Sequence, residues 1–344
     1  MPLPMKSIFN LNDIEKKTLL ILRILSEAEG PLGAKIIAEK MKDYGVSFSE
    51  RAVRHHLQIL DSRGLTVLVG RREGRIITPQ GREELGNARV RDKIGFVLAR
   101  IETLAFRTEL NVESKRGMVP INVSFFPEKQ FLKALKLMKK AFQAGLCVST
   151  LTAWAPPGNY LGEVFVPQGY MGFATVCSIV VNGFLLKKGI PMGSRFAGIL
   201  QIKKGVALRF VEIIDYTGSS LDPSEIFIRG RMTSVRQAVM QGEGKILANF
   251  REVPALARAL TLNLITELKK ASIGGVLSVG EIGDPLCEIP VDVNRFGLLL
   301  IGGLNPVALA HEAGISVENR AMATLMDMRE LRDFEEICRD LGIK

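Results

Sequence analysis

The chain has 344 residues, 47% of them hydrophobic and 24% charged, and 46 basic against 36 acidic side chains give a formal net charge of +10. These values are typical of a globular protein with two or three cores, and they exclude a disordered chain. The longest apolar runs, such as FATVCSIVVNGFLL, are shorter than the roughly 18 residues of a membrane-spanning helix, and no signal peptide precedes them.

The basic balance is densest in the N-terminal third, which suits a polyanionic partner whose affinity falls with salt. The four cysteines show no CxxC spacing, and the three histidines leave little with which to build a zinc site. We therefore expect reduced thiols, no metal site and a cytoplasmic protein without membrane contact.

Three short helices are predicted before residue 64. DIEKKTLLILRILSEAEG and PLGAKIIAEKMKDYG each carry apolar residues at helical spacing. A third helix runs from about Ser49 to Arg63, because Ser47 and Ser49 are candidate N-caps and Gly64 is a candidate terminator.

The third predicted helix has two faces of different character. Val53, Leu57 and Leu60 form an apolar stripe, whereas Arg51, Arg54, His55 and Gln58 recur at helical spacing on another face. A polar stripe of this kind is usually only solvated, so the neighbouring elements must decide its role.

A predicted β-hairpin follows the third helix and indicates a role for the polar stripe. LTVLV reads as a strand, GRREG as a turn and RIITP as the returning strand, so a basic hairpin follows three helices. This order predicts a winged helix-turn-helix domain over residues 1–80, with the third helix in the DNA major groove and the wing along the backbone. A winged helix that binds only protein is the alternative. The candidate DNA-binding residues are Ser49, Arg51, Arg54, His55 and Gln58 on the helix and Arg71, Arg72 and Arg75 in the wing.

Residues 81–116 are predicted to form a linker helix. Thr78 is its expected cap and Pro79 its first residue, and Ile94, Ile101 and Leu104 belong to one apolar stripe. This stripe fits either a helix docked on its own domain or a dimerisation helix. A homodimer is expected in any case, since winged-helix repressors generally bind two half-sites.

From residue 117 to residue 344 the chain repeats itself. Residues 121–202 align with residues 246–327 without a gap, at an offset of 125, and matched positions include Phe125 with Phe250 and Arg195 with Arg320. Each copy reads as strand, helix, strand, loop and strand, then a long apolar stretch and another strand. The predicted fold class is therefore α/β (α+β), with an internally duplicated, two-lobed regulatory domain behind the winged helix. Two such lobes enclose a cleft of the kind that binds small molecules.

Little in the sequence supports catalysis. Cys177 lies in the apolar run TVCSIVV, where a cysteine is more often a buried filler, and His311 is the one histidine outside the DNA-binding part. Phosphate-loop and dinucleotide-binding fingerprints are both missing. We therefore expect no catalytic residues, no cofactor and no enzymatic activity.

The chain resembles the NrpR nitrogen repressors of euryarchaea over nearly its whole length. The resemblance rests on RAVRHHLQILDSRGLT and TPQGREEL in the winged helix, and more specifically on GLCVSTLTAWAPPGNYLG, VPQGYMGFATVCSIVVNGFLLKKGIP and FAGILQI. It implies a dimeric repressor of nitrogen-assimilation genes that binds a palindromic operator, is induced by 2-oxoglutarate and responds to a PII-type signalling protein. Some members carry two regulatory domains or divide the parts between proteins, so a second NrpR-family protein is an alternative partner.

A five-carbon dicarboxylate needs an arginine or lysine for at least one carboxylate, with hydroxyl or N–H donors for the rest. Such chemistry is concentrated in the first copy, where Arg195 is the expected carboxylate ligand; for Arg195 the alternative is a structural ion pair, and for the two lysines a solvated turn. The candidate ligand-binding residues are Thr175, Cys177, Ser178, Lys187, Lys188, Ser194 and Arg195. The leading function is a ligand-switched repressor. The alternatives are a protein-binding adaptor or a regulator of the same architecture that responds to a different small anion, a co-regulator that acts through a partner repressor, and an enzyme fused to a DNA-binding module.

Overall fold

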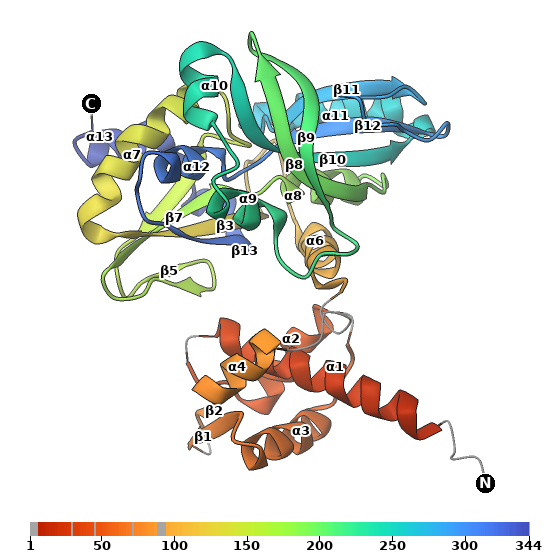
Figure 1. Cartoon of the computed structure of the whole chain (residues 1–344), viewed down its shortest axis with the longest axis vertical. Coiled ribbons are helices and arrows are strands. Elements are labelled where there is room, and N and C mark those ends of the chain that lie inside the picture. Colours follow the sequence, from red (N-terminus) through yellow and green to blue (C-terminus); the bar gives the residue numbers. More distant parts are fainter. Residues whose placement is uncertain (1–5, 29, 45, 71, 88–93, 344) are drawn as a thin grey trace. The chain divides into compact units, whose positions relative to one another are not determined.

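The computed structural model describes residues 6–28, 30–44, 46–70, 72–87 and 94–343. The chain divides into two compact units, the N-terminal unit of residues 1–100 and the regulatory unit of residues 101–344 (Figure 1). Of the described helices, none has both the length and the hydropathy that a bilayer span requires.

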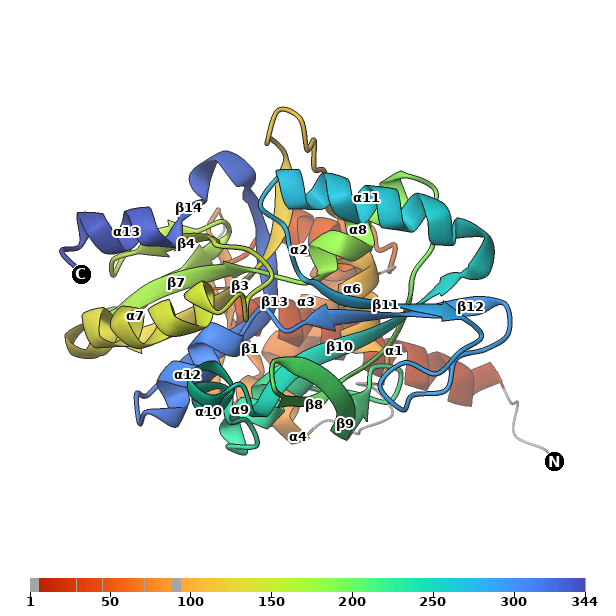
Figure 2. The ribbon, with the colours of Figure 1, turned by 90° about the horizontal axis from the view of Figure 1, so that it is seen from above.

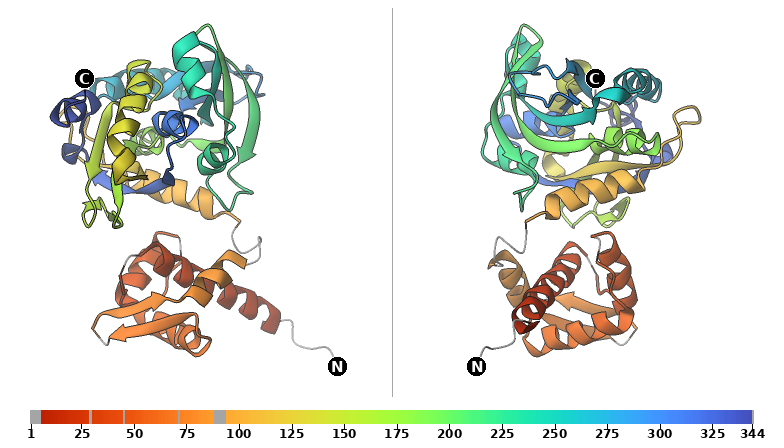
Figure 3. Two further views of the ribbon diagram at one scale, coloured as in Figure 1. Left: turned by 60° about the vertical axis from the view of Figure 1, so that its left-hand side comes forward. Right: turned by 90° about the vertical axis from the view of Figure 1, so that its right-hand side faces the viewer.

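The N-terminal unit is a winged helix, as the sequence predicts (Figure 3). The Ser49 hydroxyl caps the third helix by accepting the Ala52 N–H at 3.2 Å, and the Thr78 hydroxyl accepts the Gly81 N–H at 3.0 Å at the start of the fourth. Its elements are α1 (Lys6–Glu27), α2 (Ala34–Lys42), α3 (Glu50–Ser62), β1 (Thr66–Gly70), β2 (Gly74–Ile77) and α4 (Pro79–Asn87).

The first part of the regulatory unit covers the first copy of the repeat. Its elements are α6 (Phe96–Arg107), β3 (Met118–Pro127), α7 (Glu128–Gln143), β4 (Leu151–Ala155), β5 (Tyr160–Leu161), β6 (Val164–Phe165), β7 (Tyr170–Val176), α8 (Ile179–Lys187) and β8 (Gly193–Lys203). A connecting segment follows, with β9 (Val206–Asp215), α9 (Pro223–Arg229) and α10 (Val235–Gln241).

The second copy begins with β10 (Gly244–Pro254), the 3-10 turn η1 (Ala255–Ala257), α11 (Arg258–Lys270), β11 (Val276–Ile282), β12 (Arg295–Ile301), α12 (Asn305–Glu312) and β13 (Glu318–Asp327). The chain ends with η2 (Met328–Glu330), β14 (Arg332–Asp333) and α13 (Phe334–Asp340). Several elements recur at the offset of 125: β7 spans 170–176 and β12 spans 295–301, while β8 begins at 193 and β13 at 318. This coincidence supports a duplication.

The two copies exchange their last strands. One antiparallel sheet has the order β13-β3-β7-β4-β14 and the other β11-β12-β10-β8-β9, so β8 of the first copy pairs with β10 of the second, and β13 pairs with β3 (Figure 2). Both copies consequently contribute to one continuous hydrophobic core. The lobes are interlocked, and the interior strands β3 and β10 are buried along nearly their whole length.

The predicted linker helix differs from the structure. Within the described residues it consists of α4, which ends at Asn87, and of α6, while residues 108–117 are not helical and positions 88–93 lie outside the described ranges. In the regulatory unit α6 packs tightly on α8, as the close approach at Gly183 shows: a Cβ there would lie only 2.7 Å from the carbonyl oxygen of Ala105 in α6. Ile101 and Leu104 of the predicted apolar stripe are buried there.

Candidate DNA interface and buried polar pocket

Helix α3 presents the predicted polar stripe to solvent. Arg51, Arg54, His55 and Gln58 are all exposed, whereas the apolar stripe is completely buried. Arg54 forms an ion pair with Glu50 one turn earlier, and both side chains remain largely accessible. Because such an exposed pair contributes little, it leaves the guanidinium available for a stronger anion.

The two adjacent histidines of α3 have different environments. His56 is 8% exposed, packs against the Phe48 ring and places Nδ1 3.4 Å from the Thr18 hydroxyl. Burial, followed by the positive charges of His55 and Lys17, lowers the pKa of His56 below its usual value. His56 is therefore a neutral core residue, and of the two histidines only His55 faces outward.

The wing arginines also separate into different roles. Arg72 is exposed, Arg71 lies outside the described residues, and Arg75 Nε donates to Asp61 Oδ2 at 2.7 Å with its side chain 17% exposed. Asp61 stands near the end of α3 and also accepts the Thr66 hydroxyl at 2.6 Å. Arg75 thus ties the wing to the recognition helix, and Arg72 is the exposed arginine of the described wing.

Replacement of Arg72 by alanine is expected to flatten the plot of log affinity against log salt by about one unit, because each phosphate contact releases close to one counterion. Fluorescence anisotropy with labelled duplex DNA at several salt concentrations measures this slope. Arg209→Ala, which removes an exposed arginine from β9, is the control and should leave it unchanged. An unaltered slope for Arg72→Ala would remove this wing residue from the interface.

The three cationic side chains that were predicted to bind the effector do not lie together in one site. Arg195 pairs with Glu252 and is 42% exposed. Lys187 Nζ lies 5.0 Å above the Phe106 ring, and Lys188 stands over Phe184, both at the C-terminal end of α8. None of the three lines the polar pocket that contains Cys177 and Ser178.

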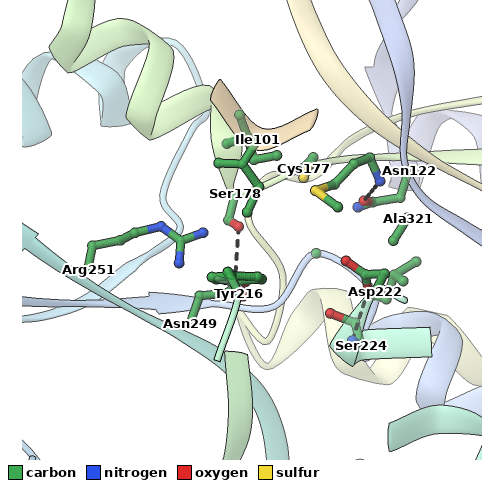
Figure 4. A pocket seen from close by; sticks show the side chains of 14 residues that line it. Ile101, Asn122, Cys177, Ser178, Tyr216, Asp222, Ser224, Asn249, Arg251 and Ala321 are labelled. Atoms are coloured by element: carbon green, nitrogen blue, oxygen red, sulfur yellow. Dashed lines mark hydrogen bonds between the residues drawn. The ribbon is translucent and has the colours of Figure 1, made fainter. Parts of the chain in front are cut away.

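That pocket lies where the two copies of the repeat meet (Figure 4). The N-terminal ends of the equivalent helices α8 and α12 both reach it, together with the interior strands β3 and β10. Its free volume is about 20 Å³, enough for roughly one water molecule. The lining residues are Ile101, Asn122, Cys177, Ser178, Ile179, Tyr216, Asp222, Ser224, Asn249, Arg251, Gly303, Leu304, Ala321 and Met322.

Buried amides organise the walls of the pocket. Asn249 Nδ2 donates to Ser178 Oγ at 3.2 Å, and the Tyr216 hydroxyl donates to Asn249 Oδ1 at 2.7 Å. Asn122 Nδ2 donates to Thr175 Oγ1 at 3.2 Å. Thr175, which was predicted to bind the ligand together with Cys177 and Ser178, therefore lies directly behind the pocket lining. These bonds fix the polar side chains in one arrangement.

Arg251, which lies on β10, supplies the positive charge of the pocket. It is 1% exposed, its Nε lies 3.4 Å from Asn182 Oδ1, and its guanidinium carbon lies 5.0 Å from the Tyr216 ring centre. Asn182 Nδ2 in turn donates to the hydroxyl of Ser194 at 3.1 Å. Ser194, one of the predicted ligand-binding residues, is therefore connected to Arg251 through Asn182.

The acidic groups of the pocket are held in a low-dielectric environment. Burial is the main cause that raises the pKa of Asp222, and it raises the pKa of the Cys177 thiol to about 11 and that of Tyr216 to about 12. Cys177 and Tyr216 therefore remain neutral at physiological pH. Such a protonated thiol is a poor nucleophile.

Glu225, next to this pocket, is expected to make stability depend on pH. Burial, then the charge of Asp222, raises its pKa from 4.5 to about 7, and it accepts the Ala321 N–H at 2.8 Å. Between those two values the folded chain keeps a proton that the unfolded chain releases, so this contribution to stability falls as pH rises from about 4.5 to 7. Urea unfolding at several pH values should show a smaller decline for Glu225→Gln than for the parent. Equal declines would contradict the assignment.

Sequence reasoning did not single out Arg251, because it looked for cationic ligand-binding residues in the first copy. The signal was present in the alignment, where Arg251 of the second copy stands opposite Phe126 of the first. Phe126 is completely buried, so a charged side chain at the equivalent strand position is unusual for a protein core.

Two family models match the chain. Residues 94–333 match the model described as NrpR regulatory domains NRD1 and 2, and residues 19–85 match the winged-helix domain of ribonuclease R. A solved structure of a nitrogen repressor-like protein from Methanococcus jannaschii superimposes with a TM-score of 0.58 at 27% identity, covering 69% of this chain and 98% of that one.

Curated relatives extend the similarity to nearly the whole chain. The global nitrogen regulator NrpRI of Methanosarcina mazei is 37% identical over 93% of this chain and 98% of its own length. The global nitrogen regulators NrpR of Methanococcus maripaludis and Methanocaldococcus jannaschii are 34% and 32% identical. The chain covers 54% and 57% of these two longer relatives.

Proposed function

This chain belongs to the NrpR family, and from that premise we propose that it represses nitrogen-assimilation genes in the cytoplasm by binding a palindromic operator until 2-oxoglutarate releases it. The observation that carries the DNA-binding part is the exposed stripe of Arg51, Arg54, His55 and Gln58 on the recognition helix of a winged helix. Ser49 supports this stripe by capping the helix.

A homodimer is part of the proposal. A palindromic operator presents two equivalent half-sites, and one winged helix per chain reads one of them. A second member of the family is a further proposed partner, because two of the relatives are almost twice as long as the aligned part. A PII-type signalling protein is proposed from the family resemblance alone.

The proposed mechanism is a population shift. A ligand releases a repressor only if it binds more tightly to the conformation that has low affinity for DNA. The effector pocket in the regulatory unit and the recognition helix would then be coupled sites, and by linkage operator DNA should weaken the binding of 2-oxoglutarate by the same factor.

This function can be tested in two steps. The chain is first used to select its binding site from a pool of random duplexes, and binding to the selected DNA fragment is then measured by electrophoretic mobility shift. We expect a specific complex that dissociates on addition of 2-oxoglutarate and is unaffected by succinate. Specific binding without any effect of 2-oxoglutarate would leave a DNA-binding protein with another effector. The absence of specific binding would reject the repressor.

The adaptor remains a second candidate because the wing carries exposed apolar side chains. Val67, Val69 and Ile76 are 46%, 48% and 37% exposed, and such residues suit a protein contact better than a phosphate backbone. A co-regulator of this kind would bind a partner repressor and show no specific DNA binding alone.

A further inference from the structure

Exposed lysines form a stripe along helix α7, at the periphery of the regulatory unit (Figure 1). They recur at intervals of four, three and four residues, which places them on one face of the helix. The members of this lysine stripe are Lys129, Lys133, Lys136 and Lys140. No carboxylate of the described residues lies within 4.0 Å of their ammonium groups, whereas Lys139 Nζ lies 2.9 Å from Glu335 Oε2.

The fold itself does not require the lysine stripe. Lysines one helical turn apart repel each other, so the stripe weakens the helix slightly unless an anion lies against it. At the offset of 125, the equivalent positions of the second copy are Pro254, Arg258, Thr261 and Ile265. The second copy therefore forms its own helix, α11, without such a stripe, and the lysines of α7 point to an anionic partner.

The lysine stripe leads directly into an apolar pocket. Ala144, the C-cap of α7, keeps a helical conformation one turn after Lys140, so it continues the same face of the helix, and it lines the pocket together with Leu146. The free volume of this pocket is about 520 Å³, within the range of roughly 300 to 1,000 Å³ that is usual for ligand sites. It shares no lining residue with the polar pocket.

Aliphatic side chains line this apolar pocket and are only partly covered. Val206 and Leu208 of β9 and Leu277 of β11 are 61%, 41% and 40% exposed. The described lining residues include no charged and no aromatic side chain, and Ser278 supplies the one hydroxyl among them. Exposed aliphatic side chains that gather around a cavity indicate a binding surface.

Basic residues also adjoin the apolar pocket. Of the described residues that stand next to a lining residue in the chain, the exposed basic ones are Lys203, Lys204, Arg209 and Lys245, and the acidic one is Glu288. Positive charge therefore accompanies the pocket on the β8–β9 turn, on β9 and on β10, in addition to α7. An occupant with an apolar group and several negative charges is complementary to this surface.

The combination of stripe and pocket favours a polypeptide over other anions. The lysine stripe extends over about 16 Å, at about 1.5 Å per residue, so it matches a row of anionic groups and not the single head group of a lipid. A nucleic acid offers a row of phosphates, but its bases stack on aromatic side chains, which the described lining does not contain. An amphipathic segment of a protein can carry both the carboxylates and an apolar anchor.

We propose that the lysine stripe and the adjoining apolar pocket form a docking surface for an acidic amphipathic segment of a partner protein. The carboxylates of the segment lie along α7, and an aliphatic side chain at one end of it fills the pocket. The net charge of +10 of this chain argues against a second copy as the occupant. The inference goes beyond the proposed function and would stand if 2-oxoglutarate proved not to be the effector.

Peptide display against the full chain, followed by fluorescence anisotropy with the synthetic consensus peptide, tests this surface. We expect the selected peptides to carry aspartate or glutamate at helical spacing and a large aliphatic residue near one end. Lys133→Glu/Lys136→Glu should weaken binding of the consensus peptide by at least about tenfold, and Val206→Asp, which places a charge in the pocket, by at least about fivefold. The matched control Lys269→Glu/Lys270→Glu reverses two exposed lysines of α11 and should stay within about twofold of the parent.

Three results would overturn the proposal. The first is a set of selected peptides without acidic residues, or a consensus peptide that binds the parent and Lys133→Glu/Lys136→Glu equally well. The second is unchanged peptide affinity in Val206→Asp, which would remove the pocket from the surface. The third is a loss of affinity for a scrambled duplex, and not for the peptide, in Lys133→Glu/Lys136→Glu, which would make the stripe a DNA contact. Should Val206→Asp lower the melting temperature, Leu277→Gln probes the same pocket with a smaller change and is expected to weaken the peptide as well.

Discussion

Replacement of both Arg51 and Arg54 by alanine is expected to reduce operator-specific binding by about 2 to 6 kcal/mol, because a groove-facing arginine that reads guanine through two hydrogen bonds contributes about 1 to 3 kcal/mol. Both side chains are exposed on α3, and the ion pair of Arg54 with Glu50 is too accessible to compete with a base or a phosphate. Arg54→Ala alone should relax the preference at one base pair.

Fluorescence anisotropy with the selected operator and with a scrambled duplex distinguishes base reading from phosphate contact. The double variant should lose affinity mainly for the operator, while Arg209→Ala/Arg229→Ala, which removes two exposed arginines from the regulatory unit, should behave like the parent. Equal losses on both duplexes would make the two arginines phosphate contacts. No loss on either would favour the adaptor.

Phe250→Ala is expected to lower the free energy of unfolding of the regulatory unit by about 3 to 5 kcal/mol, the usual effect of removing a fully buried phenylalanine. Phe250 is 0% exposed, stacks on the Phe196 ring with centroids 5.3 Å apart and meets the Phe210 ring edge-on at 6.3 Å. Phe196 lies on the exchanged strand β8, so the cavity would weaken the joint between the two copies.

Urea unfolding followed through the fluorescence of Trp154, the single tryptophan of the chain, measures this change. Leu256→Ala is the matched control, because Leu256 is fully exposed and its removal should change stability by less than about 0.5 kcal/mol. A loss below about 1 kcal/mol for Phe250→Ala would mean that the ring cluster relaxes to fill the space, and that the exchanged strand does not depend on it.

The sequence by itself determined the winged helix and the repeating pattern behind it. Ser49, Gly64 and the apolar stripe of α3 act within a few residues, through caps and helical periodicity, and these local rules were sufficient to predict α3 and the hairpin. The offset of 125 is also a property of the linear sequence. It required no knowledge of how the copies pack.

Only the tertiary structure decided which charges are partners. Arg195 was predicted as a carboxylate ligand, with an ion pair as the alternative, and Arg75 as a DNA contact. In the structure Arg195 pairs with Glu252, 57 residues away, and Arg75 of the wing pairs with Asp61 of α3. Sequence spacing predicts neighbours along one helix or strand, and it does not report ion pairs between elements that meet through folding.

The exchange of β8 and β13 was likewise decided only in three dimensions. Each strand has an apolar pattern that fits pairing either within its own copy or with the other copy, and the structure pairs β8 with β10 and β13 with β3. That exchange brings α8, α12 and Arg251 of β10 to one pocket. The candidate effector site is therefore a product of long-range packing between residues that the linear pattern treats as unrelated.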